Sequence, residues 1–107
     1  MFEKKSSHGY KPATDKIEIK TLVHGQNSLM SEFRLQKNAV LPRHSHPHEQ
    51  TGYLISGLME LTIGTKNHRV EPGDSWCIKG ELEHSGYAFE DSAAVEVFTP
   101  LREEYLP

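Results

Sequence analysis

The stretch LPRHSHPHEQTGYLISG, residues 41–57, places three histidines within five positions, directly before a segment that reads as a half-buried strand. Residues two apart in an extended strand project from the same face, so His44 and His46 are expected to point in one direction. Gln50 lies four positions further on, and a bend at Pro47 can return its side chain to that face. We interpret the stretch as part of a metal site; a solvated histidine-rich loop is the alternative interpretation.

A fourth ligand has to come from another strand, and His84 stands at the start of one in GELEHSGY. Imidazole suits Zn, Ni, Cu, Fe and Co, with Mn also reachable, so we expect one divalent transition metal per chain without fixing its identity. Each ligating histidine must be unprotonated, as a histidine near pH 7 mostly is. A lone histidine is more often a surface residue, which is the expectation for His8, His24 and His68.

The rest of the chain alternates apolar and polar residues with a period of two, which predicts strands. No stretch of a dozen residues shows a helical period. Seven to ten short strands joined by frequent turns predict an all-β sandwich or barrel. The segments that carry the pattern are KIEIKTLV, SLMSEFRLQ, TGYLISG, LMELTIG, the two strands around Pro72–Gly73–Asp74, and the two around Glu90–Asp91–Ser92.

Length and charge narrow the class of protein. A chain of 107 residues predicts one domain, with residues 1–15 as a loose polar N-terminal arm and residues 16–107 as the barrel. The net charge of −3, with both signs interspersed, gives no basic surface for nucleic acid. A single cysteine, Cys77, excludes an internal disulfide and fits a reducing compartment. Without a signal peptide or a run of about 18 apolar residues, we expect a cytoplasmic protein that does not enter a membrane.

The paired motifs resemble those of the cupins, in particular the small single-domain cupins. Their first motif is H-x-H, three or four residues, an acidic or amide ligand, six residues and a glycine, which matches His44, His46, Gln50 and Gly57. Their second motif is a turn with proline, glycine and aspartate, followed about ten residues later by histidine. Residues 71–84, EPGDSWCIKGELEH, match it and end in His84.

The resemblance implies an antiparallel double-stranded β-helix, the cupin or jelly-roll barrel, of six to ten strands and usually dimeric. It also implies one divalent metal held by His44, His46, Gln50 and His84. Most cupins have glutamate at the third position; here Glu49 lies one place early, and Gln50 has the correct distance to Gly57. The role of His48, between these residues, stays open: a pocket wall, a support for the ligands, or neither.

HSHPHEQ together with the closing EVFTPLREEYL is similar to the pectin-degradation cupins, which linearise 4,5-unsaturated monouronates. Those proteins end in D-x-F-x-P-x-R, matched here by Glu96, Phe98, Pro100 and Arg102, with glutamate in place of aspartate. The resemblance implies that Arg102 binds the uronate carboxylate, Glu96 transfers a proton and Phe98 stacks on the sugar ring. The alternatives are that Phe98 is a core residue and that Glu96 and Arg102 form a structural ion pair. Trp76 is a candidate for a pocket wall, although packing as an ordinary core or interface side chain is the favoured expectation. Cys77 is expected to be a buried small hydrophobe and not a nucleophile.

Three functions therefore compete. The leading one is a metal-dependent, non-redox isomerisation or linearisation of an unsaturated or keto sugar acid. The second is an oxygen-using metal dioxygenase, and the third is a non-catalytic cupin that binds a small acid. The charged strand over residues 16–23 reads as an unpaired sheet edge, which predicts a homodimer because pairing removes such an edge.

Overall fold

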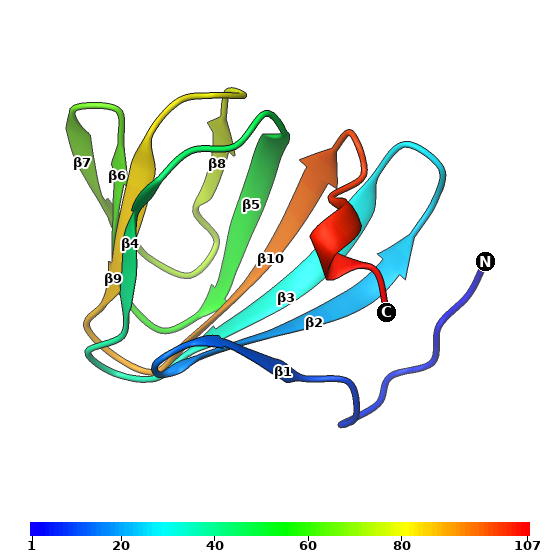
Figure 1. The fold of residues 1–107 in the computed structure, drawn as a ribbon. Coiled ribbons are helices and arrows are strands. Elements are labelled where there is room, and N and C mark those ends of the chain that lie inside the picture. The colour runs from blue at the N-terminus through cyan, green and yellow to red at the C-terminus, as the bar shows by residue number, and fades with distance from the viewer.

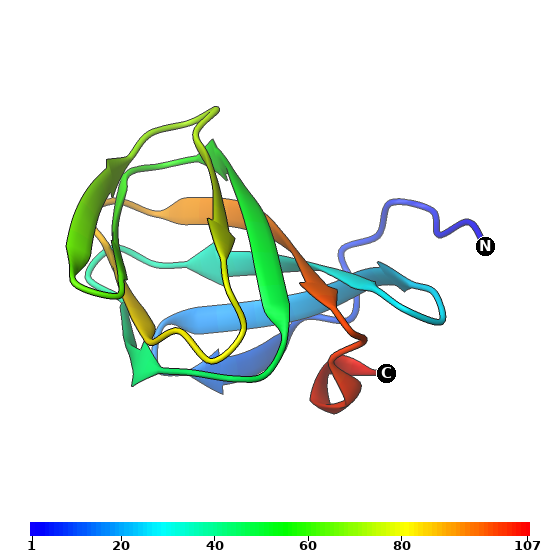
Figure 2. The same ribbon diagram turned by 90° about the horizontal axis from the view of Figure 1, so that it is seen from above.

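The computed structural model describes residues 1–107 and consists of two antiparallel β-sheets that face each other (Figures 1 and 2). One sheet has six strands in the order β1-β2-β3-β10-β5-β8, and the other has four in the order β4-β9-β6-β7. This arrangement confirms the predicted all-β jelly roll. The strands are β1 Lys11–Thr14, β2 Ile17–His24, β3 Leu29–Leu35, β4 Val40–His44, β5 Glu49–Ser56, β6 Met59–Ile63, β7 Lys66–Val70, β8 Ser75–Ile78, β9 His84–Ala88 and β10 Ser92–Thr99.

The core lies between the sheets and follows the period of two seen in the sequence. In β3 and β10 every second side chain is buried, while those between are half-buried or exposed. Leu29, Leu54 and Phe98 are fully buried, and each side chain of this kind contributes roughly 1.5–3 kcal/mol to folding. The inward face of β10 also carries Glu96, a buried carboxyl group with the polar side chains of Ser31 and Gln50 beside it.

The N-terminal segment differs from the expected loose arm, because Lys11–Thr14 form β1 and pair with β2. All four side chains of β1 are exposed, so no apolar alternation marked this strand in the sequence. Pro12 is compatible with an edge strand, where one side of the backbone needs no partner. β1 pairs only with Ile17–Ile19 of β2, so the unpaired edge expected over residues 16–23 is covered in that part and not along the rest of the strand. Assembly as a homodimer stays a prediction.

The only helical element is the 3₁₀ turn η1, Glu103–Tyr105, and no helix is long enough to cross a membrane. This turn follows β10 and folds back beside β3 (Figure 1). The ring of Tyr105 lies 5.4 Å from that of Phe98 and 6.2 Å from that of Phe33, measured between centroids. The hydroxyl of Thr21 on β2 donates a hydrogen bond to the carbonyl oxygen of Tyr105. The C-terminal turn is therefore packed against the barrel.

Candidate metal centre

Strand register brings three histidines together on the inner side of the four-stranded sheet. His44 at the end of β4 pairs directly with His84 at the start of β9, and their ring centroids are 4.2 Å apart. His46 follows β4 after one intervening residue, and its ring lies 5.0 Å from that of His84. One ring nitrogen from each of the three lies within 4.8 Å of the other two. We refer to His44, His46 and His84 as the histidine triad.

Backbone carbonyl groups set the orientation of all three rings. In each ring Nδ1 lies within hydrogen-bond distance of a nearby carbonyl oxygen. Because a carbonyl only accepts, Nδ1 carries the proton and Nε2 presents a lone pair. Second bonds of this kind orient histidines that bind metals. The pairs are His44 with Pro42 (2.7 Å), His46 with His48 (3.0 Å) and His84 with Leu82 (2.9 Å).

The buried nitrogen of His84 is the observation that tests whether a metal fits. His84 is 1% exposed, and its Nε2 has no hydrogen-bond partner in the protein. Burial lowers the pKa of His84 to about 4, and that of His46 is also lowered, chiefly by burial. Both rings are therefore uncharged at neutral pH and can donate lone pairs to a cation. The triad fits a divalent transition metal, whose identity these ligands leave open.

Gln50, and not Glu49, lies beside the triad. The Gln50 amide nitrogen donates to Oε1 of Glu96 at 2.5 Å, which turns the amide oxygen toward Nε2 of His46 at 3.0 Å. Both atoms of that second contact are acceptors when His46 holds its proton on Nδ1, so a cation between them would relieve their repulsion. Glu49 points outward, is exposed and accepts a bond from the Cys77 thiol. The role of Gln50 as fourth ligand is supported by this geometry and stays a prediction.

Glu96 on β10 is held by residues from two other strands of its sheet, β5 and β8. Trp76, Gly52 and Glu96 are directly opposite one another across β8, β5 and β10. Because Gly52 has no side chain, the indole of Trp76 lies over it and donates to Oε1 of Glu96 at 3.0 Å. Burial raises the pKa of Glu96, while the bonds from Gln50 and Trp76 oppose that rise. Both bonds end on Oε1, so Oε2 has no hydrogen bond within the protein.

Arg102 and Phe98 meet at the edge of this site. The guanidinium carbon of Arg102 lies 4.9 Å from the centroid of the Phe98 ring and 4.4 Å from that of Tyr105. Arg102 pairs with Glu104, Nε to Oε1 at 2.5 Å, and not with Glu96. The structural ion pair considered as an alternative for Glu96 and Arg102 is therefore not formed. Phe98 is 0% exposed, as a core residue would be, and the guanidinium covers one face of its ring.

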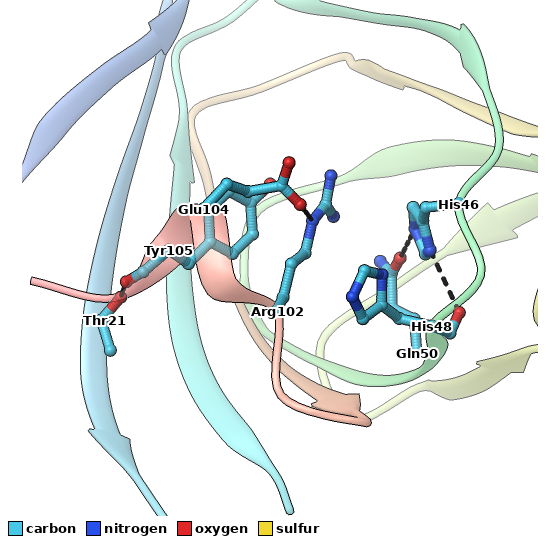
Figure 3. A network of polar contacts seen from close by, with 7 residues as sticks. All are labelled: Thr21, His46, His48, Gln50, Arg102, Glu104 and Tyr105. Atoms are coloured by element: carbon cyan, nitrogen blue, oxygen red, sulfur yellow. Dashed lines mark hydrogen bonds and ion pairs between the residues drawn. The ribbon is translucent and has the colours of Figure 1, made fainter.

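His48 lies on the Arg102 side of Gln50 and His46 (Figure 3). Its ring is half-buried, 5.6 Å from the ring of His46 and 6.5 Å from that of Phe98. Its Nδ1 is buried and has no hydrogen-bond partner. The sequence left the role of His48 open, and the structure places its ring at the border of the site.

The family model for the cupin domain matches residues 31–99, well over half of the chain. The chain is a cupin. No curated protein matches its sequence. Among solved structures, KdgF from Halomonas sp. has a TM-score of 0.93 and 26% identity, covering 99% of this chain and 100% of that one. The SPY1581 protein from Streptococcus pyogenes, of unknown function, has a TM-score of 0.73 and 30% identity, covering 80% and 75%. An RmlC-like cupin from Shewanella frigidimarina, at 17% identity and a TM-score of 0.89, shares the fold and covers 94% and 90%.

Sequence reasoning missed Glu104 and Tyr105 at the site of this cupin and favoured core or interface over pocket wall for Trp76. The small residue Gly52, on the face of Gln50, was the signal that an aromatic ring could lie there. Glu104 and Tyr105 lie beyond the matched C-terminal pattern, and no periodicity marks a single 3₁₀ turn. Cys77 was expected to be buried but is exposed, because it faces outward on the edge strand β8.

Replacing Gly52 with alanine should destabilise this cupin by about 1–3 kcal/mol, the usual range for overpacking a filled region. An alanine Cβ would lie 2.2 Å from the Trp76 indole, so the ring would have to move and release Glu96. Urea unfolding measures the loss, and tryptophan fluorescence reports the movement, because Trp76 is the only tryptophan. Gly25→Ala is the control, since nothing lies within 4 Å of its added carbon. Equal stability of the two variants would contradict the prediction.

Proposed function

We propose that this cupin is a metal-dependent enzyme that linearises an unsaturated uronate-like sugar acid without a redox step. The observation that carries the proposal is the Arg102 guanidinium, of which only Nε is bonded to protein. It lies over the ring of Phe98, which is 5.8 Å from the ring of His46, and its positive charge helps to lower the pKa values of His46 and His84. A cation with free donors beside a candidate metal centre is suited to an anionic, carboxylate-bearing ligand. The C-terminal pattern and the structural similarity to KdgF support the same class.

Each group at the site has a physical role in this proposal. The triad and Gln50 would hold the metal, which when bound supplies a Lewis acid for vicinal sugar oxygens. The terminal nitrogens of Arg102 bind the ligand carboxylate through two parallel hydrogen bonds. Glu96 transfers a proton at Oε2, the oxygen without a protein partner, and its raised pKa suits an acid–base group. Phe98 excludes water beneath Arg102; stacking on a sugar ring stays a prediction.

Arg102→Ala should lower kcat/KM for an unsaturated monouronate by about 30-fold or more, because truncating one partner of a desolvated charge pair costs roughly 2–5 kcal/mol. Turnover is followed in zinc-loaded protein under nitrogen, and metal content is measured in the same samples. The metal should remain bound, since Arg102 is not one of the candidate metal ligands. Arg69→Ala is the matched control, because Arg69 is exposed on β7 and makes no hydrogen bond through its side chain.

The other functions give different results in the same assay. Turnover that requires oxygen and a redox-active metal would indicate a dioxygenase. Saturable binding of the sugar acid without any chemical change would indicate a binding module. Loss of turnover in Arg69→Ala as well as in Arg102→Ala would mean that neither effect is specific to the carboxylate.

A further inference from the structure

The C-terminal turn holds Arg102 from several sides. Glu104, two residues further along the chain, accepts a hydrogen bond from Nε of Arg102 (Figure 3). The ring of Tyr105 lies against the guanidinium, and its carbonyl oxygen is bonded to Thr21 on β2. The backbone bond from Tyr105 N–H to the Arg102 carbonyl, at 3.0 Å, closes the turn that places Glu104 there.

The Glu104 contact leaves the other end of the guanidinium free. Nε lies on one edge of the planar guanidinium group, and the two terminal nitrogens, Nη1 and Nη2, make no hydrogen bond with the protein. The Arg102 side chain is only 13% exposed, whereas that of Glu104 is 60% exposed. An arginine can bind one carboxylate through Nε and a second through its terminal nitrogens, because its five N–H groups lie in a planar fork. Glu104 therefore occupies one edge and leaves the other for a ligand.

We propose that Glu104 is a positioning residue that fixes the guanidinium of Arg102 over Phe98 and Tyr105, with its two terminal nitrogens presented to the carboxylate of a bound sugar acid. The choice of a sugar acid rests on the proposed function above, whereas the fixing of Arg102 does not. Preorganisation of this kind strengthens binding because the side chain is already ordered before the ligand arrives.

The direction of the change in ligand affinity distinguishes a positioning role of Glu104 from a simple effect of its charge. Glu104 is negative, so removing its charge should strengthen the binding of any anion nearby. Positioning predicts the reverse, because Arg102 becomes free to rotate. Glu103 is the matched control: it is the adjacent residue, has the same charge, is exposed, and its side chain makes no hydrogen bond or ion pair.

The experiment compares wild type, Glu104→Gln and Glu103→Gln as zinc-loaded full-length protein. Calorimetric titration with D-galacturonate, a saturated monouronate, should give about tenfold weaker binding for Glu104→Gln, as expected when one charge-assisted hydrogen bond no longer orders the site. Glu103→Gln should bind as tightly as wild type or slightly more tightly. NMR of the Arg102 Nε–H group without ligand should show slow exchange with water in wild type and Glu103→Gln, and faster exchange in Glu104→Gln.

Equal or tighter galacturonate binding by Glu104→Gln, relative to Glu103→Gln, would overturn the proposal and indicate that Glu104 competes with the ligand. Unchanged Nε–H exchange in Glu104→Gln would overturn it whatever the ligand is. If wild type binds no galacturonate but its Nε–H exchange depends on Glu104, the fixing of Arg102 is supported and galacturonate is rejected as the ligand. Turnover of an unsaturated monouronate by wild type then decides the proposed function separately. The two failures are thus distinguishable.

Discussion

Alanine in place of His84 should empty the metal site, taking the content from about one divalent ion per chain to almost none. His84 is the ligand that comes from β9, and its Nε2 is the buried atom with no other partner. Its removal leaves only His44, His46 and Gln50 as candidate ligands, and these lack the third imidazole of the triad. Elemental analysis of untagged protein measures the effect directly.

His68→Ala is the control for that measurement, since His68 is exposed on the outer strand β7. It should retain the metal content of wild type. Wild-type protein that holds no metal after incubation with zinc, nickel and manganese would contradict the metal site itself and every activity that depends on it.

Phe98→Ala should lower the free energy of unfolding by about 3–5 kcal/mol, the usual cost of truncating a buried phenylalanine. The ring is fully buried and lies close to the rings of Phe33, His46 and Tyr105. Its loss would leave a cavity between the core and the histidine triad, and Arg102 would lose one of its two supporting rings. Urea unfolding of metal-free protein measures the change without a contribution from metal binding.

Phe98→Leu separates the two roles considered for this residue. Leucine retains much of the buried apolar volume, so most of the lost stability should return. If Phe98 is only a core residue, turnover should return with stability. Turnover that stays low in a stable Phe98→Leu protein would instead show that the aromatic ring acts on Arg102 or on the ligand. A Phe98→Ala protein as stable as wild type would contradict the core role.

The sequence predicted the all-β class and the common direction of His44 and His46 because both follow from short-range patterns. Alternation with a period of two shows which face of each strand is buried, and the spacing of His44 and His46 places them on one side of an extended segment. His84 was found through a second motif, although its position opposite His44 depends on the pairing of β4 with β9. Such long-range register cannot be derived from spacing alone.

The parts that the sequence did not predict depend on which strands pair and in which register. The Trp76 bond to Glu96 exists because β8 and β10 lie on either side of β5, with Gly52 between them. The strand β1 has only exposed side chains, so backbone pairing alone defines it. Position 96 has glutamate where the C-terminal pattern described above has aspartate, and the structure shows what the longer side chain does. Gln50 lies opposite Phe98, so Glu96 is the diagonal neighbour of Gln50, and its side chain reaches the Gln50 amide.

The position of Trp76 on β8 has a consequence for motion. This strand has four residues and lies at the edge of its sheet, paired only with β5. Peripheral strands open by local unfolding at a lower free energy than central ones. Each such opening withdraws the indole from Glu96 and leaves the Gln50 amide as the remaining donor to that carboxylate. The order of the candidate metal centre on the Glu96 side therefore depends on how often this short strand opens, while His44 and His84 are held by pairing within the opposite sheet.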